Sequence, residues 1–262
     1  MKFWTRINSR WTREQLASWS SIFKTLYILF PVIIYYLAGD ITEVILWVLL
    51  NSVLTGASEE TMQVMSQLNG TIQGMIYAIG LLVSILFFRK AAMNEITLAF
   101  EDDEKKQKLS AGKVLLLILI ALVSSIGLNY LMAVTGFTSS SETYREIQNA
   151  QYSVNFVSGL IIYGICSPLV EELMFRGLIY NRMKRIFPLA VSMVVSSLLF
   201  GLFHGNMVQG VYATIMGGVM VLCYEKFKSF LAPLIVHITA NLGVYILSYT
   251  TFGKMLFGNL VN

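Results

Sequence analysis

Charged residues, cysteines and histidines are scarce in this chain of 262 residues. Only 13% of the residues are charged and 56% are hydrophobic, and the mean hydropathy of +0.66 excludes an ordinary soluble domain. The two cysteines, Cys166 and Cys223, both lie in apolar stretches, so neither a disulfide framework nor a cysteine-rich zinc site is indicated. We interpret both as small core residues.

The sequence also lacks an internal repeat, a low-complexity tract and a linker rich in proline, glycine or serine. These absences predict a single unit. The apolar runs predict that this unit is all-α, a polytopic bundle of about seven to eight transmembrane helices. We divide the chain into an interfacial N-terminal segment, N-terminal transmembrane helices with their loops, a helical core that holds the candidate site, and a C-terminal tail. These regions are residues 1–21, 22–150, 151–250 and 251–262.

Seven apolar runs have the length of a membrane span or nearly so. They occupy roughly residues 22–38, 70–88, 114–136, 153–185, 189–204, 207–223 and 230–250. The stretch 41–57 is also apolar, but it is short and is interrupted by Glu43, Asn51 and Gly56. It is therefore either an eighth span or a re-entrant helix.

The net charge of +4 comes from lysines and arginines that cluster between the apolar runs. Such clusters fit loops beside anionic lipid, and they imply no nucleic-acid partner. Seven spans would place all four clusters on one face of the membrane. The positive-inside rule identifies this face as cytoplasmic, so the N-terminus is also expected to be cytoplasmic. The clusters are residues 2–24, 89–113, 182–185 and 226–228.

The N-terminal segment interleaves arginines with tryptophans, a composition typical of a helix at the lipid–water interface. The residues concerned are Arg6, Arg10, Arg13, Trp4, Trp11 and Trp19. Polar and aromatic residues precede the first apolar run, so we expect no cleaved signal peptide. Residues 101–108, which alternate in charge, are predicted to form a solvated loop.

The segment 166–177 places three ionisable residues in an apolar environment, where charges are costly and therefore indicate function. Glu172 and Arg176 are four residues apart and can pair on one helix face. Glu171 points about 100° away and lacks that partner, so its carboxylate is available as a general base. Pro168 is predicted to kink the helix and to open room for water.

The two histidines of the chain also lie in apolar runs, and each has a companion four residues away. Phe200 shares a helix face with His204, and His237 shares one with Asn241. A histidine ring beside an asparagine amide can stabilise the oxyanion that forms when water attacks a carbonyl. Phe200 is interpreted as a wall of the site.

Distance along the helices indicates that these groups lie at similar depth in the membrane. If Arg185 is near the surface, Glu171 lies about 21 Å from it at 1.5 Å per residue. His204 lies about 24 Å beyond Pro188 on the returning helix. His237 is only about 14 Å past Lys228, so an offset of one or two helical turns remains, which tilt or kinking could remove.

The patterns EExxxR at Glu171–Arg176, FxxxH at Phe200–His204 and HxxxN at His237–Asn241 together resemble the CAAX protease and bacteriocin-processing family. This family, also called Abi, consists of intramembrane glutamic endopeptidases. The resemblance covers about 70 residues and does not extend to residues 1–150.

The resemblance implies a role for each matching residue. Glu171 would activate the hydrolytic water with help from His204, and His237 and Asn241 would form the oxyanion hole. Glu172 and Arg176 would hold the architecture. It also implies a peptidase that needs no metal or other cofactor. Its substrate would be a prenylated CAAX protein, a bacteriocin or pheromone precursor, or a membrane-protein tail.

Other readings remain open. Glu172 and Arg176 alone could be only a structural ion pair. A zinc peptidase would use Glu171, His204 and His237 as ligands, although the HExxH motif is absent. A non-enzymatic bacteriocin-immunity or regulatory protein, and a proton-coupled transporter, are two further alternatives. In every case the expected partners are membrane lipids and, for an enzyme, a membrane-adjacent peptide. The compact size and short loops suggest a bacterial cell membrane.

Overall fold

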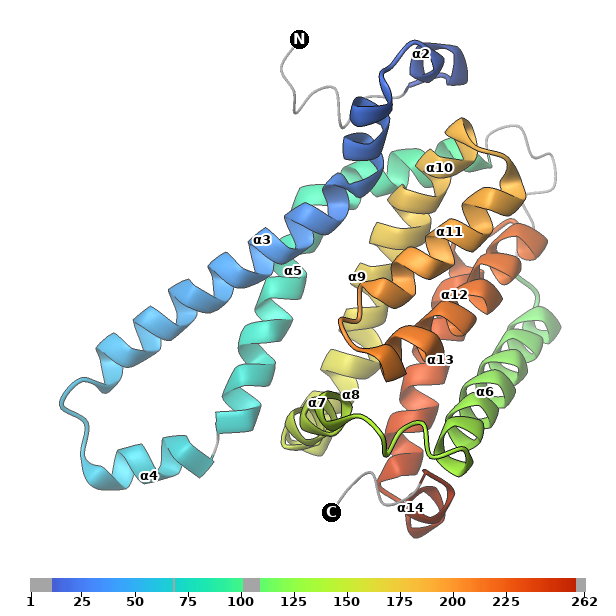
Figure 1. The fold of residues 1–262 in the computed structure, drawn as a ribbon. Coiled ribbons are helices and arrows are strands. Elements are labelled where there is room, and N and C mark those ends of the chain that lie inside the picture. Colours follow the sequence, from blue (N-terminus) through green and yellow to red (C-terminus); the bar gives the residue numbers. More distant parts are fainter. Residues whose placement is uncertain (1–10, 68, 101–108, 258–262) are drawn as a thin grey trace.

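The computed structural model describes residues 11–67, 69–100 and 109–257, and within these ranges every regular element is a helix (Figure 1). The predicted loop 101–108 and most of the charged N-terminal residues lie outside the described residues. The elements are α2 (Arg13–Ala17), α3 (Ser21–Leu54), α4 (Glu59–Gln67), α5 (Asn69–Ala99), α6 (Ala111–Val134), α7 (Glu142–Tyr152), α8 (Phe156–Ile161), η1 (Ile162–Cys166), α9 (Ser167–Glu172), η2 (Leu173–Tyr180), α10 (Asn181–Ile186), α11 (Leu189–Leu202), α12 (Met207–Phe227), α13 (Leu231–Ser248) and α14 (Thr251–Phe257).

Among the described residues, six helices are long and apolar enough to cross a membrane, and the apolar helix α11 is shorter. The predicted polytopic helical bundle is confirmed. The alternatives for residues 41–57 are both wrong, because this stretch up to Leu54 continues the first span as one helix, α3. No proline interrupts residues 36–45, and the single Gly39 there is tolerated in a long apolar helix.

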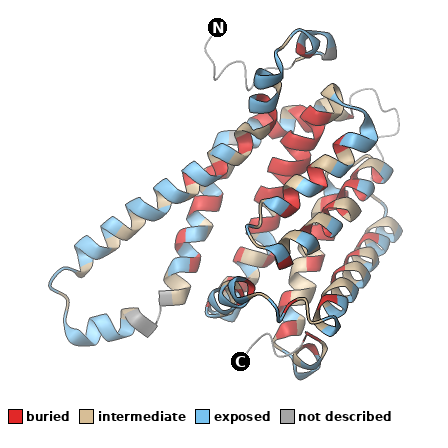
Figure 2. Ribbon diagram, viewed as in Figure 1, coloured by how far each residue is buried: buried red, intermediate tan, exposed pale blue. Residues whose placement is uncertain are grey.

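Helices α3, α4 and α5 form an arm that diverges from the rest of the bundle (Figure 1). Helices α3 and α5 cross closely within the arm, since a Cβ added to Gly80 would lie 3.3 Å from the Cα of Gly39. Small residues allow membrane helices to approach this closely. Beyond the crossing α3 is largely exposed along its length, so most of its apolar surface is left for lipid (Figure 2).

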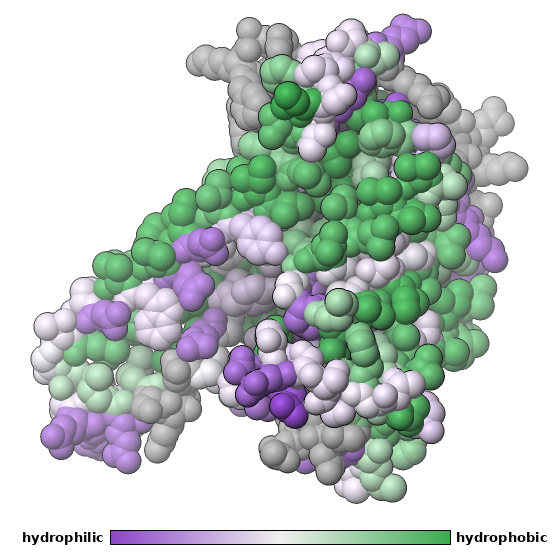
Figure 3. Space-filling model, in the orientation of Figure 1, coloured by the Kyte–Doolittle hydropathy of each residue, from purple (hydrophilic) through white to green (hydrophobic). Residues whose placement is uncertain are grey.

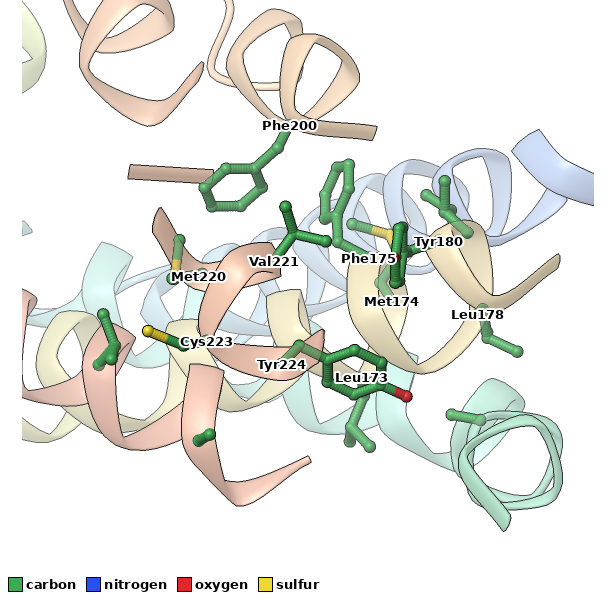
Figure 4. Packing of buried hydrophobic residues seen from close by; sticks show 14 of the residues in the cluster. Leu173, Met174, Phe175, Leu178, Tyr180, Phe200, Met220, Val221, Cys223 and Tyr224 are labelled. Atoms are coloured by element: carbon green, nitrogen blue, oxygen red, sulfur yellow. The ribbon is translucent and has the colours of Figure 1, made fainter. Parts of the chain in front are cut away.

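The centre of the bundle is one long helical stretch from Phe156 to Ile186, made of α8, η1, α9, η2 and α10. All residues of η2 are buried, because α3, α5 and α11 pack against them (Figure 2). Figure 4 shows Phe175, Phe200, Met220 and Tyr224 meeting in this core. Cys223 is buried there and Cys166 is half-buried; both are free thiols.

Pro168, which is predicted to kink the helix, lies in the short α-helix α9, and a π-helical segment stands on either side of α9, η1 before it and η2 after it. Pro168 is at the start of α9, where its missing N–H leaves a backbone carbonyl without the usual helical donor. Wide π-turns of this kind are frequent at functional sites, since they rotate side chains and free backbone groups. Both candidate glutamates lie on α9, between the two wide segments.

Candidate active site

Glu172 and Arg176 form the ion pair that their spacing predicts. Arg176 Nη1 donates to Glu172 Oε1 over 2.7 Å, and both side chains are buried. Arg176 Nη2 also donates to the carbonyl of Gly217 in α12 over 3.1 Å, and its guanidinium lies 4.7 Å from the centre of the Phe200 ring. The pair therefore ties α9 and η2 to α11 and α12.

Glu171 has a different environment from its neighbour. The residue is 6% exposed, and its Oε1 accepts a hydrogen bond of 2.5 Å from Ser167 Oγ. Its Oε2 has no hydrogen-bond partner among the described residues, and it lies 3.7 Å from His237 Nε2. One carboxylate oxygen is thus held by Ser167, while the other lies beside the ring of His237.

His237 bridges the two glutamates. Its Nδ1 lies 2.8 Å from Glu172 Oε1, while its Nε2 faces Glu171. Glu172 is paired with Arg176, so it acts as the acceptor and His237 Nδ1 as the donor. With Nδ1 protonated, His237 Nε2 carries a hydrogen only when the ring is an imidazolium. The offset in depth expected for His237 is absent, because its ring contacts α9 directly.

His204 does not lie in a helix, contrary to the sequence prediction. Helix α11 ends at Leu202, and His204 occupies the turn before Gly205, whose φ of +70° suits glycine. Its Nδ1 lies 2.9 Å from the carbonyl of Phe200, which can only accept, so Nδ1 donates. In the neutral ring Nε2 is then a free acceptor. The ring also packs edge-on against Phe200, with ring centres 5.1 Å apart.

Asn241 lies one turn beyond His237 on α13 and is half-buried. Its amide nitrogen donates to the carbonyl of Tyr163 over 3.0 Å. Tyr163 belongs to the π-helical segment η1. This bond orients the amide of Asn241 and leaves its second N–H for another acceptor.

Three cavities meet at these residues. A small one of about 60 Å³ is lined by Glu171, His204, His237 and Asn241, with Phe200 as part of its wall. Two larger ones, of about 490 and 440 Å³, both reach Glu171 and His204 from different sides. The candidate residues of four separate elements therefore share one space that is large enough for water and open to a longer molecule.

Sequence reasoning missed Ser167 and Tyr77. Ser167 stands four residues before Glu171, so the i,i+4 rule could have found it. Tyr77 comes from α5, and its hydroxyl lies 3.4 Å from Ser167 Oγ and 3.0 Å from the hydroxyl of Tyr35. No spacing within the candidate motifs could have indicated this chain of hydroxyls, because it depends on how α3 and α5 dock.

The zinc alternative needs three ligands at one point. Within the described ranges, no group of three or more His, Cys, Asp or Glu side chains is arranged to hold a metal ion. Glu171, His204 and His237 as arranged in the structure therefore do not form a three-ligand zinc site.

Residues 153–243 match the family model described as "Type II CAAX prenyl endopeptidase Rce1-like". The chain is also similar to a protein of Bacillus subtilis (strain 168) named "Putative membrane peptidase YdiL". The two are 27% identical over 141 residues, which cover 47% of this chain and 58% of the relative. No solved structure gives a significant match.

The family match spans α9, α11 and α12 and ends within α13, so it contains every residue of the three motifs. It begins at the N-terminal side of η1 and leaves out the arm formed by α3, α4 and α5. The matched part, the peptidase relative and the bundle of apolar helices agree with one another, and residues 153–243 are similar to the CAAX prenyl endopeptidase family of membrane proteins.

Proposed function

We propose that this protein is an intramembrane endopeptidase that hydrolyses a peptide bond with a water activated by Glu171. The observation that carries the proposal is the different state of the two neighbouring carboxylates. Glu172 is paired with Arg176 and lines none of the three cavities, whereas Glu171 has no lysine or arginine partner among the described residues and lines all three cavities. A buried carboxylate that is oriented but not paired is suited to general base catalysis.

In the first step a water in the small cavity lies between Glu171 Oε2 and His204 Nε2. Both are acceptors when His204 is neutral, so together they can polarise the water and take one of its protons. The water oxygen then bonds to the carbonyl carbon of the substrate, whose double bond to oxygen opens to give an oxyanion. Ser167 supports this step because its hydrogen bond fixes the rotamer of Glu171.

In the second step the negative charge on the former carbonyl oxygen needs donors. His237 as an imidazolium presents Nε2–H to the cavity, and Asn241 presents its second N–H. The C–N bond then breaks as the oxyanion collapses, and the proton taken from the water passes to the leaving nitrogen. Arg176 and Glu172 make no contact with the reacting atoms in this scheme; they hold α9 against α12 and orient His237.

The substrate is proposed to be a peptide segment anchored in or beside the membrane, as in a prenylated CAAX protein or a bacteriocin or pheromone precursor. Two cavities of several hundred Å³ reach the site, and both are bounded by helices of membrane-spanning length. We also propose that the N-terminus is cytoplasmic, because the basic clusters fall between spans on one side.

The test is cleavage of a membrane-adjacent peptide by purified protein in lipid vesicles. Glu171→Gln keeps the shape of the side chain and an acceptor for Ser167, yet it removes the base. Since a positioned general base contributes about 10²–10⁴-fold, we expect kcat to fall by about a thousandfold while the melting temperature is maintained.

Glu59→Gln on α4 is the matched control, because Glu59 is exposed and lies outside all three cavities. It should cleave like the wild type. If Glu171→Gln cleaves at the wild-type rate, the proposed mechanism is wrong. Inhibition by a chelator that added zinc reverses would favour the metal alternative, and an unaltered immunity phenotype in Glu171→Gln cells would favour a non-catalytic role.

A further inference from the structure

The cavity of about 490 Å³ lies between the arm of α3 and α5 and the body of the bundle, and it ends at Glu171 and His204. Figure 3 shows hydrophilic side chains gathered in the hollow between arm and body, although apolar surface surrounds it. The arm lies outside the part of the chain that the family model matches. A polar hollow inside apolar surroundings indicates that something polar binds there.

The charge of this cavity is of one sign. Asp40 and Glu43 line it from α3, Glu171 lines it from α9, and no lysine or arginine is among the described residues that line it. Between Lys24 and the end of α3, Asp40 and Glu43 are the two charged residues of the helix. The cavity is therefore acidic in a protein whose net charge is +4.

Neither Asp40 nor Glu43 forms a hydrogen bond or an ion pair with another residue in the part of the chain that the structure describes. Both face the cavity from one stripe of α3 at positions 36, 40, 43 and 47, which the helical repeat places in line. Carboxylates without a counter-charge beside a membrane are costly. The cost falls when a cation of the substrate occupies the cavity.

Aromatic rings flank the two carboxylates. Tyr36 and Trp47 stand at the ends of the same stripe and also line the cavity, as does Tyr77 from α5. The combination of acidic side chains and aromatic faces is the chemistry that binds ammonium and guanidinium groups, through ion pairing and cation–π contact. Independently of these groups, the buried Glu171, whose Oε2 has no hydrogen-bond partner among the described residues, also lines this cavity.

The cavity of about 440 Å³ on the other side of Glu171 has a different character. It is lined by the neutral amides of Asn129, Gln148, Gln151 and Gln209 and by several tyrosines, and Glu171 is its one charged residue among those described. Amides bind the backbone of an extended peptide but do not select for charge. The two sides of the site thus differ in what they select.

We propose that the arm selects substrates that carry lysine or arginine next to the scissile bond, on the side that enters the α3–α5 cavity. Asp40 and Glu43 bind the cationic side chain, and the flanking segment on the other side lies in the neutral amide-lined cavity. This inference rests on the proposed peptidase function, which defines the scissile bond. It adds that the substrate is cationic on one side of that bond.

A binding experiment tests the selection apart from catalysis. The full-length Glu171→Gln protein in neutral-lipid vesicles is titrated with a fluorescent apolar peptide that contains a Lys-Lys pair, and with its twin that contains Glu-Glu. The Lys-Lys peptide should bind at least about tenfold more tightly, and the preference should shrink at high salt. Asp40→Asn combined with Glu43→Gln should remove about tenfold of this affinity.

Glu59→Gln with Glu60→Gln is the control, because it removes the same charge from exposed positions of α4 outside the cavity. This control should bind both peptides as Glu171→Gln alone does. Equal binding of the two peptides, or the same loss of Lys-Lys affinity in the α4 control and in the Asp40 and Glu43 variant, would overturn the inference.

Cleavage by the protein with an intact Glu171 distinguishes the two proposals. If the charge preference is absent but Glu171 is needed for cleavage, the inference fails and the proposed function stands. If the preference is present in binding while Glu171→Gln cleaves normally, the function fails and the arm still binds cationic peptides. Asp40→Lys with Glu43→Lys should reverse the preference toward the Glu-Glu peptide in both assays.

Discussion

Glu171 and Glu172 are adjacent in sequence, yet each side chain meets a different set of neighbours. The spacing of four residues to Arg176 is a local property, so the ion pair of Glu172 could be predicted from the sequence. The contact of His237 with both glutamates could not, since it depends on how α13 docks against α9. Residue spacing alone left His237 one or two turns too far away.

Ser167 is the residue whose removal best tests how Glu171 is oriented. Ser167→Ala removes the hydrogen bond to Oε1 and lets the carboxylate rotate, so kcat should fall by about tenfold while KM changes little. Ser167→Thr restores a hydroxyl at the same position and should recover most of the rate. Steady-state kinetics on the peptide substrate measures both parameters.

Ser197→Ala is the control for that variant. Ser197 is a buried serine of α11 whose hydroxyl donates to the carbonyl of Met193, away from the site. If Ser197→Ala lowers kcat as much as Ser167→Ala, or if Ser167→Thr remains as slow as Ser167→Ala, the hydroxyl does not act through Glu171.

At the scale of helices, the positions of the spans could be predicted from hydropathy, but where several of them end and how they bend could not. The continuation of α3 through residues 41–54 depends on its close crossing with α5 at Gly39 and Gly80. The end of α11 before His204 depends on Gly205 and on Asn206, which caps α12. The ends of these helices therefore depend on packing and on turn-forming residues, which an average of hydropathy does not describe.

The contact of α11 with α12 depends on glycine at position 201. A Cβ there would lie 1.9 Å from Thr214 Oγ1 and 2.4 Å from the backbone carbonyl oxygen of Gly210. Backbone cannot yield as a side chain can, so Gly201→Ala should force the helices apart and lower the free energy of unfolding by about 1–3 kcal/mol. Because His204 follows α11 directly, cleavage should fall as well.

Gly218→Ala provides the comparison within the same pair of helices. A Cβ on Gly218 meets no atom within 4 Å, and alanine is the better helix former by about 1 kcal/mol. Thermal unfolding in detergent should therefore show an unchanged or higher midpoint for Gly218→Ala and a lower one for Gly201→Ala. Equal midpoints would mean that the α11–α12 contact is not tight.

At the scale of the whole molecule, the protein combines a half-buried centre with an exposed arm. The central stretch from Phe156 to Ile186 is half buried and holds the glutamates, whereas the arm exposes apolar surface to lipid and borders the cavity of about 490 Å³. The sequence motifs could locate the centre, because all of them lie between Glu171 and Asn241. They carry no information on the arm, whose role follows only from the fold.

Arm and body are joined at one end by a buried charged cluster. Glu95 of α5 pairs with Arg182 and Arg185 of α10, and both arginines also contact Tyr27 of α3. This cluster lies away from the cavities and fixes the end of the bundle where α3, α5 and α10 meet. Further along the arm, α3 and α5 border the cavity of about 490 Å³.

The central claim is that a membrane-adjacent peptide bond is cut by this protein through Glu171. The most direct measurement compares, by quantitative mass spectrometry, membranes from cells that carry the wild type and cells that carry Glu171→Gln at equal abundance. We expect at least one membrane-associated peptide whose new terminus is present in the wild type, is lost in Glu171→Gln and remains in Glu59→Gln. The same set of termini in all three samples would contradict the account.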